Sequence, residues 1–194
     1  MIYSIPRYPV HLIDVVRVAN GRRVTVRPTL PQDAELQQQF FRSLSAEGRY
    51  YRFMTRLPEL PTSLVQRFSA VDYQSHVALL AEVFEDDRQT MVGEARYVIS
   101  ETDPLSCEFA VSVADAWQEL GIARAMLARL EREAAAAGLH RIVADTLLTN
   151  RAMIGLARRA GYSVTTNRHD ATLAHLEKQL LPALSNQGAK PIAA

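Results

Sequence analysis

The residues that most constrain the fold of this chain form a strand pattern, a loop and a long helical pattern in direct succession. Residues 107–113 alternate along the chain as residues of a β-strand do. From residue 120 to 137, apolar residues recur at steps of three and four, which predicts a helix with one apolar face. Gly138 ends that helix, and residues 140–146 form the next strand pattern. Because a helix separates these two strands, we expect them to run parallel.

Antiparallel strands and shorter helices are predicted around this crossover. The pair Asn20-Gly21, in which both residues accept positive φ, predicts a β-hairpin. Further strands are expected at residues 15–18, 23–26, 77–84, 91–99, 162–166 and 172–177, and further helices after Asp33, Ser45 and Asn150 and around residues 64–68. The predicted fold class is therefore α/β (mixed α+β), with a central, mostly antiparallel sheet, one parallel β-α-β crossover and helices on both faces.

The length and composition fit one soluble globular domain with short extensions. The chain has 194 residues, of which 48% are hydrophobic and 22% charged. We divide it into an N-terminal extension with the first hairpin strand (1–23), a main domain (24–180) and a C-terminal tail (181–194), in which we expect disorder from residue 185. A net charge of +1 demands neither nucleic acid nor a membrane as partner.

A cytoplasmic location is expected from what the chain lacks. Its apolar runs are too short to span a membrane, and its start does not have the order of a secretory signal. The single cysteine, Cys107, allows no internal disulfide, which suits a reducing compartment, and we interpret it as a buried thiol. The histidines show no metal-ligand spacing, so no metal is expected.

The loop and helix start at residues 118–124 could hold a phosphate group. The first N–H groups of a helix have no partner within it, and the helix dipole places partial positive charge at that end. Gly121 and Ala123 carry almost no side chain, so a diphosphate could approach the backbone closely. An isolated Gln-x-x-Gly-x-Ala motif is nevertheless explained as well by tight helix–strand packing.

Neighbouring motifs favour the phosphate interpretation. Residues 113–123, together with 150–153 and 160–162, resemble the acetyl-coenzyme A (acetyl-CoA) site of the GNAT N-acetyltransferase superfamily, in which Arg/Gln-x-x-Gly-x-Gly/Ala opens the central helix. Upstream segments resemble the acetyltransferase domain of the Pat-type protein lysine acetyltransferases: residues 26–28, 31–33, 41–45, 51–53 and 71–73. The resemblance covers roughly residues 24 to 178 and implies the GNAT fold with acetyl-CoA as co-substrate.

The resemblance also implies which residues bind the cofactor. Backbone groups of two strand residues would meet the pantetheine arm, the helix start would surround the pyrophosphate, and Asn150 would contact the pantetheine or cysteamine end. The implied residues are Val111, Val113, Gln118, Gly121, Ile122, Ala123, Arg124, Asn150 and Met153. Ala123 occupies a position that is most often glycine in the family.

Glu108 is the candidate general base. An unperturbed lysine has a pKa of about 10.4, so an amine acceptor must lose a proton before it can attack a thioester. The strand period places Glu108 on the face opposite Phe109 and Val111, and the resemblance implies that a glutamate in this Glu-Phe-Ala context is the base. Partial burial would raise its pKa and help it accept a proton. Without the resemblance, a solvated strand carboxylate is the simpler interpretation.

No residue is assigned as the general acid. Many superfamily members place a tyrosine in the helix after Asn150, but Ala157 occupies that position here. Tyr162 is near in sequence and is interpreted as a core aromatic residue. A thiol pKa of about 8.5 makes the thiolate a tolerable leaving group without help.

Three functions remain open from the sequence: acetylation of a protein lysine, acetylation of a small amine, and a non-catalytic acyl-CoA-binding module that regulates a partner. One group of residues could line the substrate entrance or contact the cofactor's phosphates, and is explained equally well as an interface or a structural cluster: Arg49, Arg52 and Arg56 with Tyr50, Tyr51 and Phe53. The acceptor is not identified, and a homodimer is left open.

Overall fold

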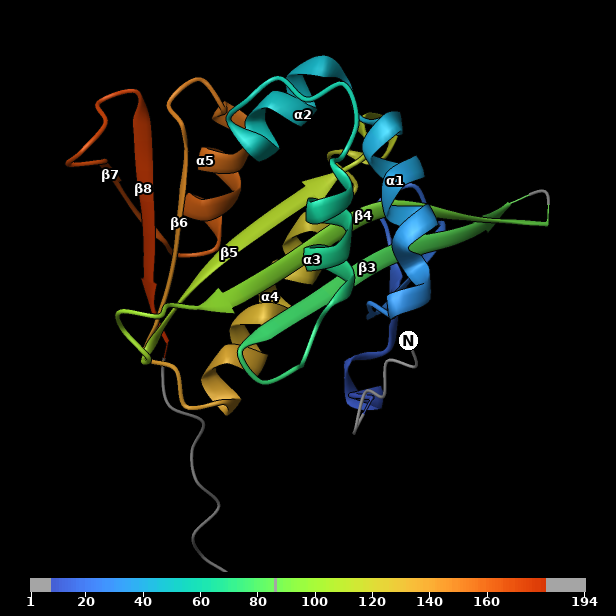
Figure 1. The fold of residues 1–194 in the computed structure, drawn as a ribbon, viewed down its shortest axis with the longest axis horizontal. Helices are drawn as coiled ribbons and strands as arrows, with labels where there is room; N and C mark the ends of the chain where they lie inside the picture. Colours follow the sequence, from blue (N-terminus) through green and yellow to red (C-terminus); the bar gives the residue numbers. More distant parts are fainter. Residues whose placement is uncertain (1–7, 86, 181–194) are drawn as a thin grey trace, which may run out of the picture.

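The computed structural model describes residues 8–85 and 87–180, which build one eight-stranded sheet in the order β1-β2-β3-β4-β5-β6-β8-β7 (Figure 1). The strands are β1 Asp14–Arg17, β2 Arg23–Pro28, β3 His76–Glu85, β4 Arg88–Ile99, β5 Ser106–Val113, β6 Arg141–Leu147, β7 Ser163–Thr166 and β8 Leu173–Gln179. The tail expected to be disordered from residue 185 lies outside the described residues.

Within the described part of the chain, β5 and β6 are the one parallel pair, and all other neighbouring strands are antiparallel. This confirms the predicted fold class and the crossover at its centre. The predicted first hairpin is also confirmed, since β1 pairs with β2 around Gly21, whose φ is +83°. Glycine adopts this conformation without a steric penalty.

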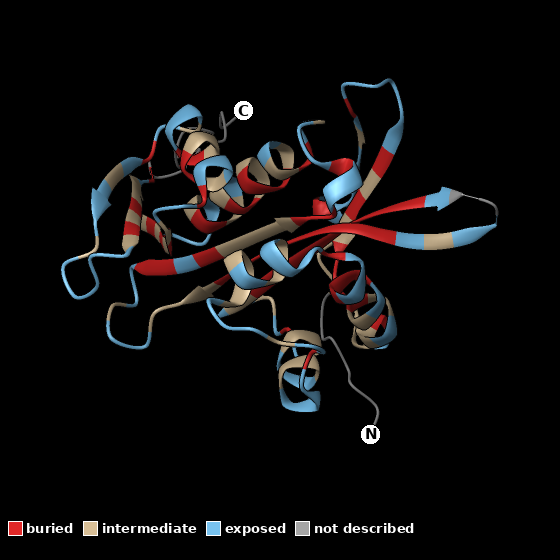
Figure 2. Ribbon diagram, turned by 90° about the horizontal axis from the view of Figure 1, so that it is seen from above, coloured by how far each residue is buried: buried red, intermediate tan, exposed pale blue. Residues whose placement is uncertain are grey.

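Helices cover both faces of the sheet. Helix α4, Ile122–Ala136, packs across β3, β4 and β5 on one face, where its buried residues Met126, Leu127 and Leu130 complete the core (Figures 1 and 2). The other face carries α1 (Ala34–Ser43), α2 (Ala46–Phe53) and α3 (Thr62–Ser69). Short 3-10 turns lie at Val10–Leu12, Pro31–Asp33 and Asp115–Trp117, and α5 is Arg151–Arg159.

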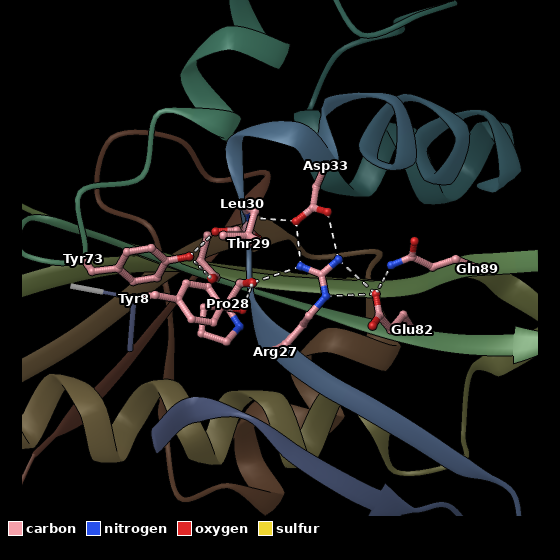
Figure 3. Close-up of polar contacts among 10 residues, drawn as sticks. Tyr8, Arg27, Pro28, Thr29, Leu30, Asp33, Tyr73, Glu82 and Gln89 are labelled. Carbon is pink, nitrogen blue, oxygen red and sulfur yellow. Dashed lines mark hydrogen bonds and ion pairs between the residues drawn. The ribbon is translucent and has the colours of Figure 1, made fainter. Parts of the chain in front are cut away.

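A buried ion cluster fastens β2 to the start of α1. Arg27 donates from Nη1 and Nη2 to the two carboxylate oxygens of Asp33, at 2.7 and 2.8 Å, and from Nε to Glu82 at 3.1 Å (Figure 3). Gln89 donates to the same Glu82 oxygen at 2.7 Å. Burial alone would lower the pKa of Arg27, but the hydrogen bonds to Asp33 and Glu82 raise it, so the guanidinium stays charged. We name this group the Arg27 cluster.

Candidate active site

The strands β5 and β6 separate and open a cleft in the middle of the sheet. They pair only over Ser106–Glu108 and residues 141–143, after which β5 continues beside β4 and β6 beside β8. The cleft between them has a volume of about 810 Å³. Its walls come from β5, the loop and first turn of α4, β6, the start of α5, and α2. All the proposed site residues line it: Glu108, Val111, Val113, Gln118, Gly121, Ile122, Ala123, Arg124, Asn150 and Met153.

The backbone of β5 offers hydrogen-bonding groups to this cleft. Ala114 donates its N–H to the carbonyl oxygen of Val92 at 2.9 Å, and β4 and β5 pair in continuous register from there. Antiparallel neighbours bond through every second residue, so Ser112 also faces β4, whereas Val111 and Val113 direct their N–H and C=O groups to the other side. That side is the cleft, where extended polar chains can pair with a strand edge.

The start of α4 has the geometry of an anion site. Gly121 is its N-cap residue with φ +92°, and no side chain caps the helix. The first helical bond is that from Ala125 N to Gly121 O, at 3.0 Å, so the preceding N–H groups have no partner within the helix. A Cβ built on Gly121 would meet nothing within 4 Å, so the approach to these N–H groups is open.

The Gln118 side chain turns toward its own loop. Its amide donates to Val113 O at 3.2 Å and to Asp115 Oδ1 at 3.4 Å. It therefore shapes the loop that precedes the helix start while lining the cleft. Contact of Gln118 with a pyrophosphate stays a prediction.

Asn150 joins α5 to β6 at the opposite wall. Its Oδ1 accepts from Met153 N at 3.1 Å and its Nδ2 donates to Thr146 Oγ1 at 3.0 Å. The predicted N-cap role is confirmed. Both ends of this amide are engaged within the protein, and its contact with the cofactor stays a prediction.

Glu108 is exposed at the edge of the cleft. It lies in register with Val98 of β4 and Val143 of β6. Among the described residues, its side-chain carboxylate has neither a hydrogen bond nor an ion pair. The partial burial that we considered for Glu108 is not found, because β6 turns away from β5 just after this residue. Its neighbour Cys107 points into the core, where burial raises the pKa of the thiol to about 12.

The two residues considered for the general acid are both in the core. Ala157 is fully buried in α5 and carries no proton to give. Tyr162 packs against Phe109 with ring centroids 5.3 Å apart, which confirms it as a core aromatic residue. Burial, with Glu131 close by, raises the pKa of Tyr162.

Helix α2 contributes a further wall of the cleft, and it carries Tyr51 and Arg52 of the group that the sequence analysis considered for the substrate entrance. Ser45, Tyr51 and Met54 are among its lining residues. Arg52 also lines the cleft, and its Nε donates to Glu94 of β4 at 3.0 Å. Ser45 was predicted to cap a short turn, but the local sequence did not indicate that the following helix would cover a cleft formed by residues more than 50 positions later.

A buried charge network lies beneath α2. Glu94 accepts hydrogen bonds from Arg52 and, at 2.9 Å, from Arg96. Burial by itself would raise the pKa of Glu94, but the two guanidinium groups lower it to about 2. Arg96 Nη1 contacts His76 Nε2 at 3.2 Å, and burial followed by the charge of Arg96 lowers the pKa of His76 to about 4. Arg96 also stacks over Phe68 at 3.9 Å. We name this group the Glu94 network; Arg52 is thus in part structural.

In the described residues there is no helix long and apolar enough to cross a membrane, and no group of three or more His, Cys, Asp or Glu side chains is placed to hold a metal ion.

Comparison with known proteins gives the same family from sequence and from structure. The model of the acetyltransferase (GNAT) family matches residues 38–162. An acetyltransferase of Pseudomonas aeruginosa is 31% identical over 153 residues, which are 79% of this chain and 82% of that protein.

Two solved structures are similar in fold. The GNAT domain of S. lividans PAT is 30% identical with a TM-score of 0.83, covering 90% of this chain and 100% of that one. A putative acetyltransferase of Salmonella typhimurium, solved with its cofactor acetyl-CoA, is 21% identical with a TM-score of 0.60. The match covers 88% of this chain and 99% of that one.

Proposed function

Since the chain belongs to the acetyltransferase (GNAT) family, we propose that it acetylates a protein lysine, with Glu108 as the general base. Members of this family are acetyl-CoA-dependent N-acetyltransferases, and acetyl-CoA is the acetyl donor of this enzyme. The observation that carries the proposal is the cleft itself. It brings a helix start with unpaired N–H groups, a free strand edge and an unpaired carboxylate together.

Each wall has a separate task in this reaction. The N–H groups at the start of α4 bind the pyrophosphate, and Val111 and Val113 pair through their backbone with the amides of the pantetheine arm. Glu108 accepts a proton from the acceptor ammonium group, and the neutral nitrogen then attacks the thioester carbonyl carbon. The C–S bond breaks and the thiolate leaves, and it takes up the second proton that the nitrogen loses as the amide forms. Backbone N–H groups of β5 stabilise the oxyanion in between.

The resemblance to Pat-type enzymes and the 30% identity to the GNAT domain of S. lividans PAT support a protein lysine as acceptor. To test this, labelled acetyl-CoA is incubated with the enzyme and a host lysate. Label in lysine side chains of protein supports the proposal. Label in the small-molecule fraction alone would assign the enzyme to small amines, and no transfer with intact cofactor binding would indicate a regulatory module.

The helix start can be tested with a matched pair of glycines at the two ends of α4. Gly121 and Gly138 have φ values of +92° and +82°, and a Cβ on either meets nothing within 4 Å. Alanine is therefore similarly strained at both positions, by about 1–2 kcal/mol. By isothermal titration we expect Gly121→Ala to weaken acetyl-CoA binding by about tenfold or more, a loss of about 1.4 kcal/mol, and Gly138→Ala to leave it unchanged. Equal acetyl-CoA affinities of the two variants would contradict the assignment of the pyrophosphate to this helix start.

A further inference from the structure

Helix α2 is held over the cleft by polar contacts more than by its own burial. None of its residues is fully buried. At its C-terminal end Phe53 packs against Phe41, with ring centroids 5.5 Å apart, and Arg52 pairs with Glu94. At its middle Tyr51 Oη donates either to Thr149 O, at 3.2 Å, or to Glu47, at 2.8 Å. In Figure 1, α2 lies beside the start of α5 and the end of β5.

The N-terminal end of α2 is fastened by one carboxylate. Asp115 accepts from Ser45 N at 2.8 Å with one oxygen and from Ser45 Oγ at 2.9 Å with the other. Ser45 is the N-cap residue of α2 and itself accepts from Gly48 N at 3.0 Å. Hydrogen bonds to a charged acceptor are stronger than neutral ones, so this pair can fix the end of a helix that lacks a buried face.

Asp115 also belongs to the loop that leads to the start of α4. Its Oδ1 accepts from Gln118 Nε2 at 3.4 Å, and Gln118 donates to Val113 O as well. The same carboxylate therefore bonds to the cofactor loop and to the cap of α2. Through Asp115 the loop is therefore connected to α2, which forms the wall with Tyr51 and Met54.

We propose that Asp115 is a positioning residue that couples the cofactor loop to α2, so that bound acetyl-CoA orders the acceptor wall of the cleft. The inference rests on the proposed function, because it needs acetyl-CoA in this cleft. Acceptor and cofactor would then bind in order, with the cofactor first. Asp115 itself lines the cleft, and the role proposed for it is exerted through its bonds to Ser45 and Gln118.

The chain offers a closely matched control carboxylate. Asp170 also accepts from the N–H and the hydroxyl of a single residue, Thr172, at 2.8 and 2.6 Å, in the turn between β7 and β8, although both bonds end on its Oδ1. Asp115→Asn and Asp170→Asn each replace a charged acceptor by a neutral amide. Only the first connects two elements that line the cleft.

The test is amide hydrogen exchange of residues 46–53 in the full chain, with and without saturating acetyl-CoA. We expect acetyl-CoA to slow exchange there by about tenfold in the wild type and in Asp170→Asn. In Asp115→Asn we expect the cofactor to bind with an affinity within about threefold of the wild type, or about 0.7 kcal/mol, while the slowing is lost. In assays of Asp115→Asn with a peptide acceptor, the KM for the peptide should rise, while kcat at saturating peptide changes little.

The outcomes separate the two proposals. If the wild type does not bind acetyl-CoA, the proposed function is wrong. If it binds and α2 exchange responds equally in the wild type and in Asp115→Asn, the coupling through Asp115 is wrong. Ser45→Ala removes one of the two bonds to Asp115 together with the cap bond from Gly48 N, so the measure is the change in exchange that acetyl-CoA causes within this variant. A reduced change supports the coupling even if Asp115→Asn folds poorly, and an unchanged one contradicts it.

Discussion

The Arg27 cluster and the cleft beside β5 both place carboxylates next to the sheet, in opposite electrostatic situations. In the Arg27 cluster, Asp33 and Glu82 have side chains only 4% and 6% exposed, and both are paired with Arg27. In the cleft, Glu108 is exposed and has no partner among the described residues. A buried charge needs a partner because losing water costs several kcal/mol, whereas an exposed carboxylate can stay free to take up a proton. The difference separates the structural role of Asp33 and Glu82 from the chemical role that we propose for Glu108.

The largest expected effect tests the chemical side. Glu108→Gln keeps the shape of the side chain but removes the base, so kcat at neutral pH should fall by about 10²–10⁴-fold. Acetyl-CoA affinity by isothermal titration should not change. Glu101→Gln, an exposed carboxylate in the preceding turn, is the control and should keep full activity. A full rate in Glu108→Gln would end its assignment as base.

On the structural side, Arg27→Met should destabilise the fold strongly. It leaves two buried carboxylates without their positively charged partner, which costs about 3–5 kcal/mol. Denaturant unfolding measures this against Arg42→Met, which breaks an ion pair with Glu59 whose side chains are 57% and 63% exposed. That control should cost about 1 kcal/mol or less. Similar losses in both variants would mean that the Arg27 cluster does not hold β2 to α1.

The Glu94 network predicts a pH dependence of stability. The folded-state pKa of His76 is about 4, and the unfolded chain takes up the same proton near pH 6.5. Between these values the unfolded state binds more protons, so the free energy of unfolding decreases as the pH falls from 6.5 to 4, by about 3 kcal/mol. His76→Gln should flatten this part of the curve, and His169→Gln, in an exposed turn, should not. An unchanged slope in His76→Gln would contradict the burial argument.

The smallest effect is expected at Cys107, next to Glu108 on the same strand. Burial raises the pKa of its thiol to about 12, so it carries almost no thiolate at neutral pH. A thiol reagent should leave the native enzyme unlabelled and active, and should label it after denaturation. Rapid labelling of the native protein with loss of activity would contradict the burial of Cys107 and its interpretation as an inert thiol.

Much of the fold could be predicted because its signals are local. Asn20-Gly21 specifies a tight turn by backbone conformation, Asn150 caps the helix that follows it, and Gly138 ends α4. The parallel pairing of β5 and β6 follows from the helix between them. The helix start at Gly121 was predicted in the same way, since unpaired N–H groups are a property of every helix end.

The walls of the cleft could not be predicted in this way, because they depend on contacts between distant segments. Asp115 and Ser45 are 70 residues apart, and Tyr51 and Thr149 are 98 apart. No periodicity relates such positions. The exposure of Glu108 depends likewise on where β6 leaves β5, which the strand patterns do not specify.

The sequence by itself determined the elements and the crossover, because turn conformation, capping and strand alternation act over a few residues. It indicated the site residues only through the resemblance to the GNAT family, and their roles stay predictions. Only the tertiary structure decided that α2 covers the cleft, that Arg27 and Glu94 are held in buried charge clusters, and that Glu108 is left free. The physical reason is that pairing and burial of charges depend on packing between elements, and packing is fixed only when the whole sheet and its helices come together.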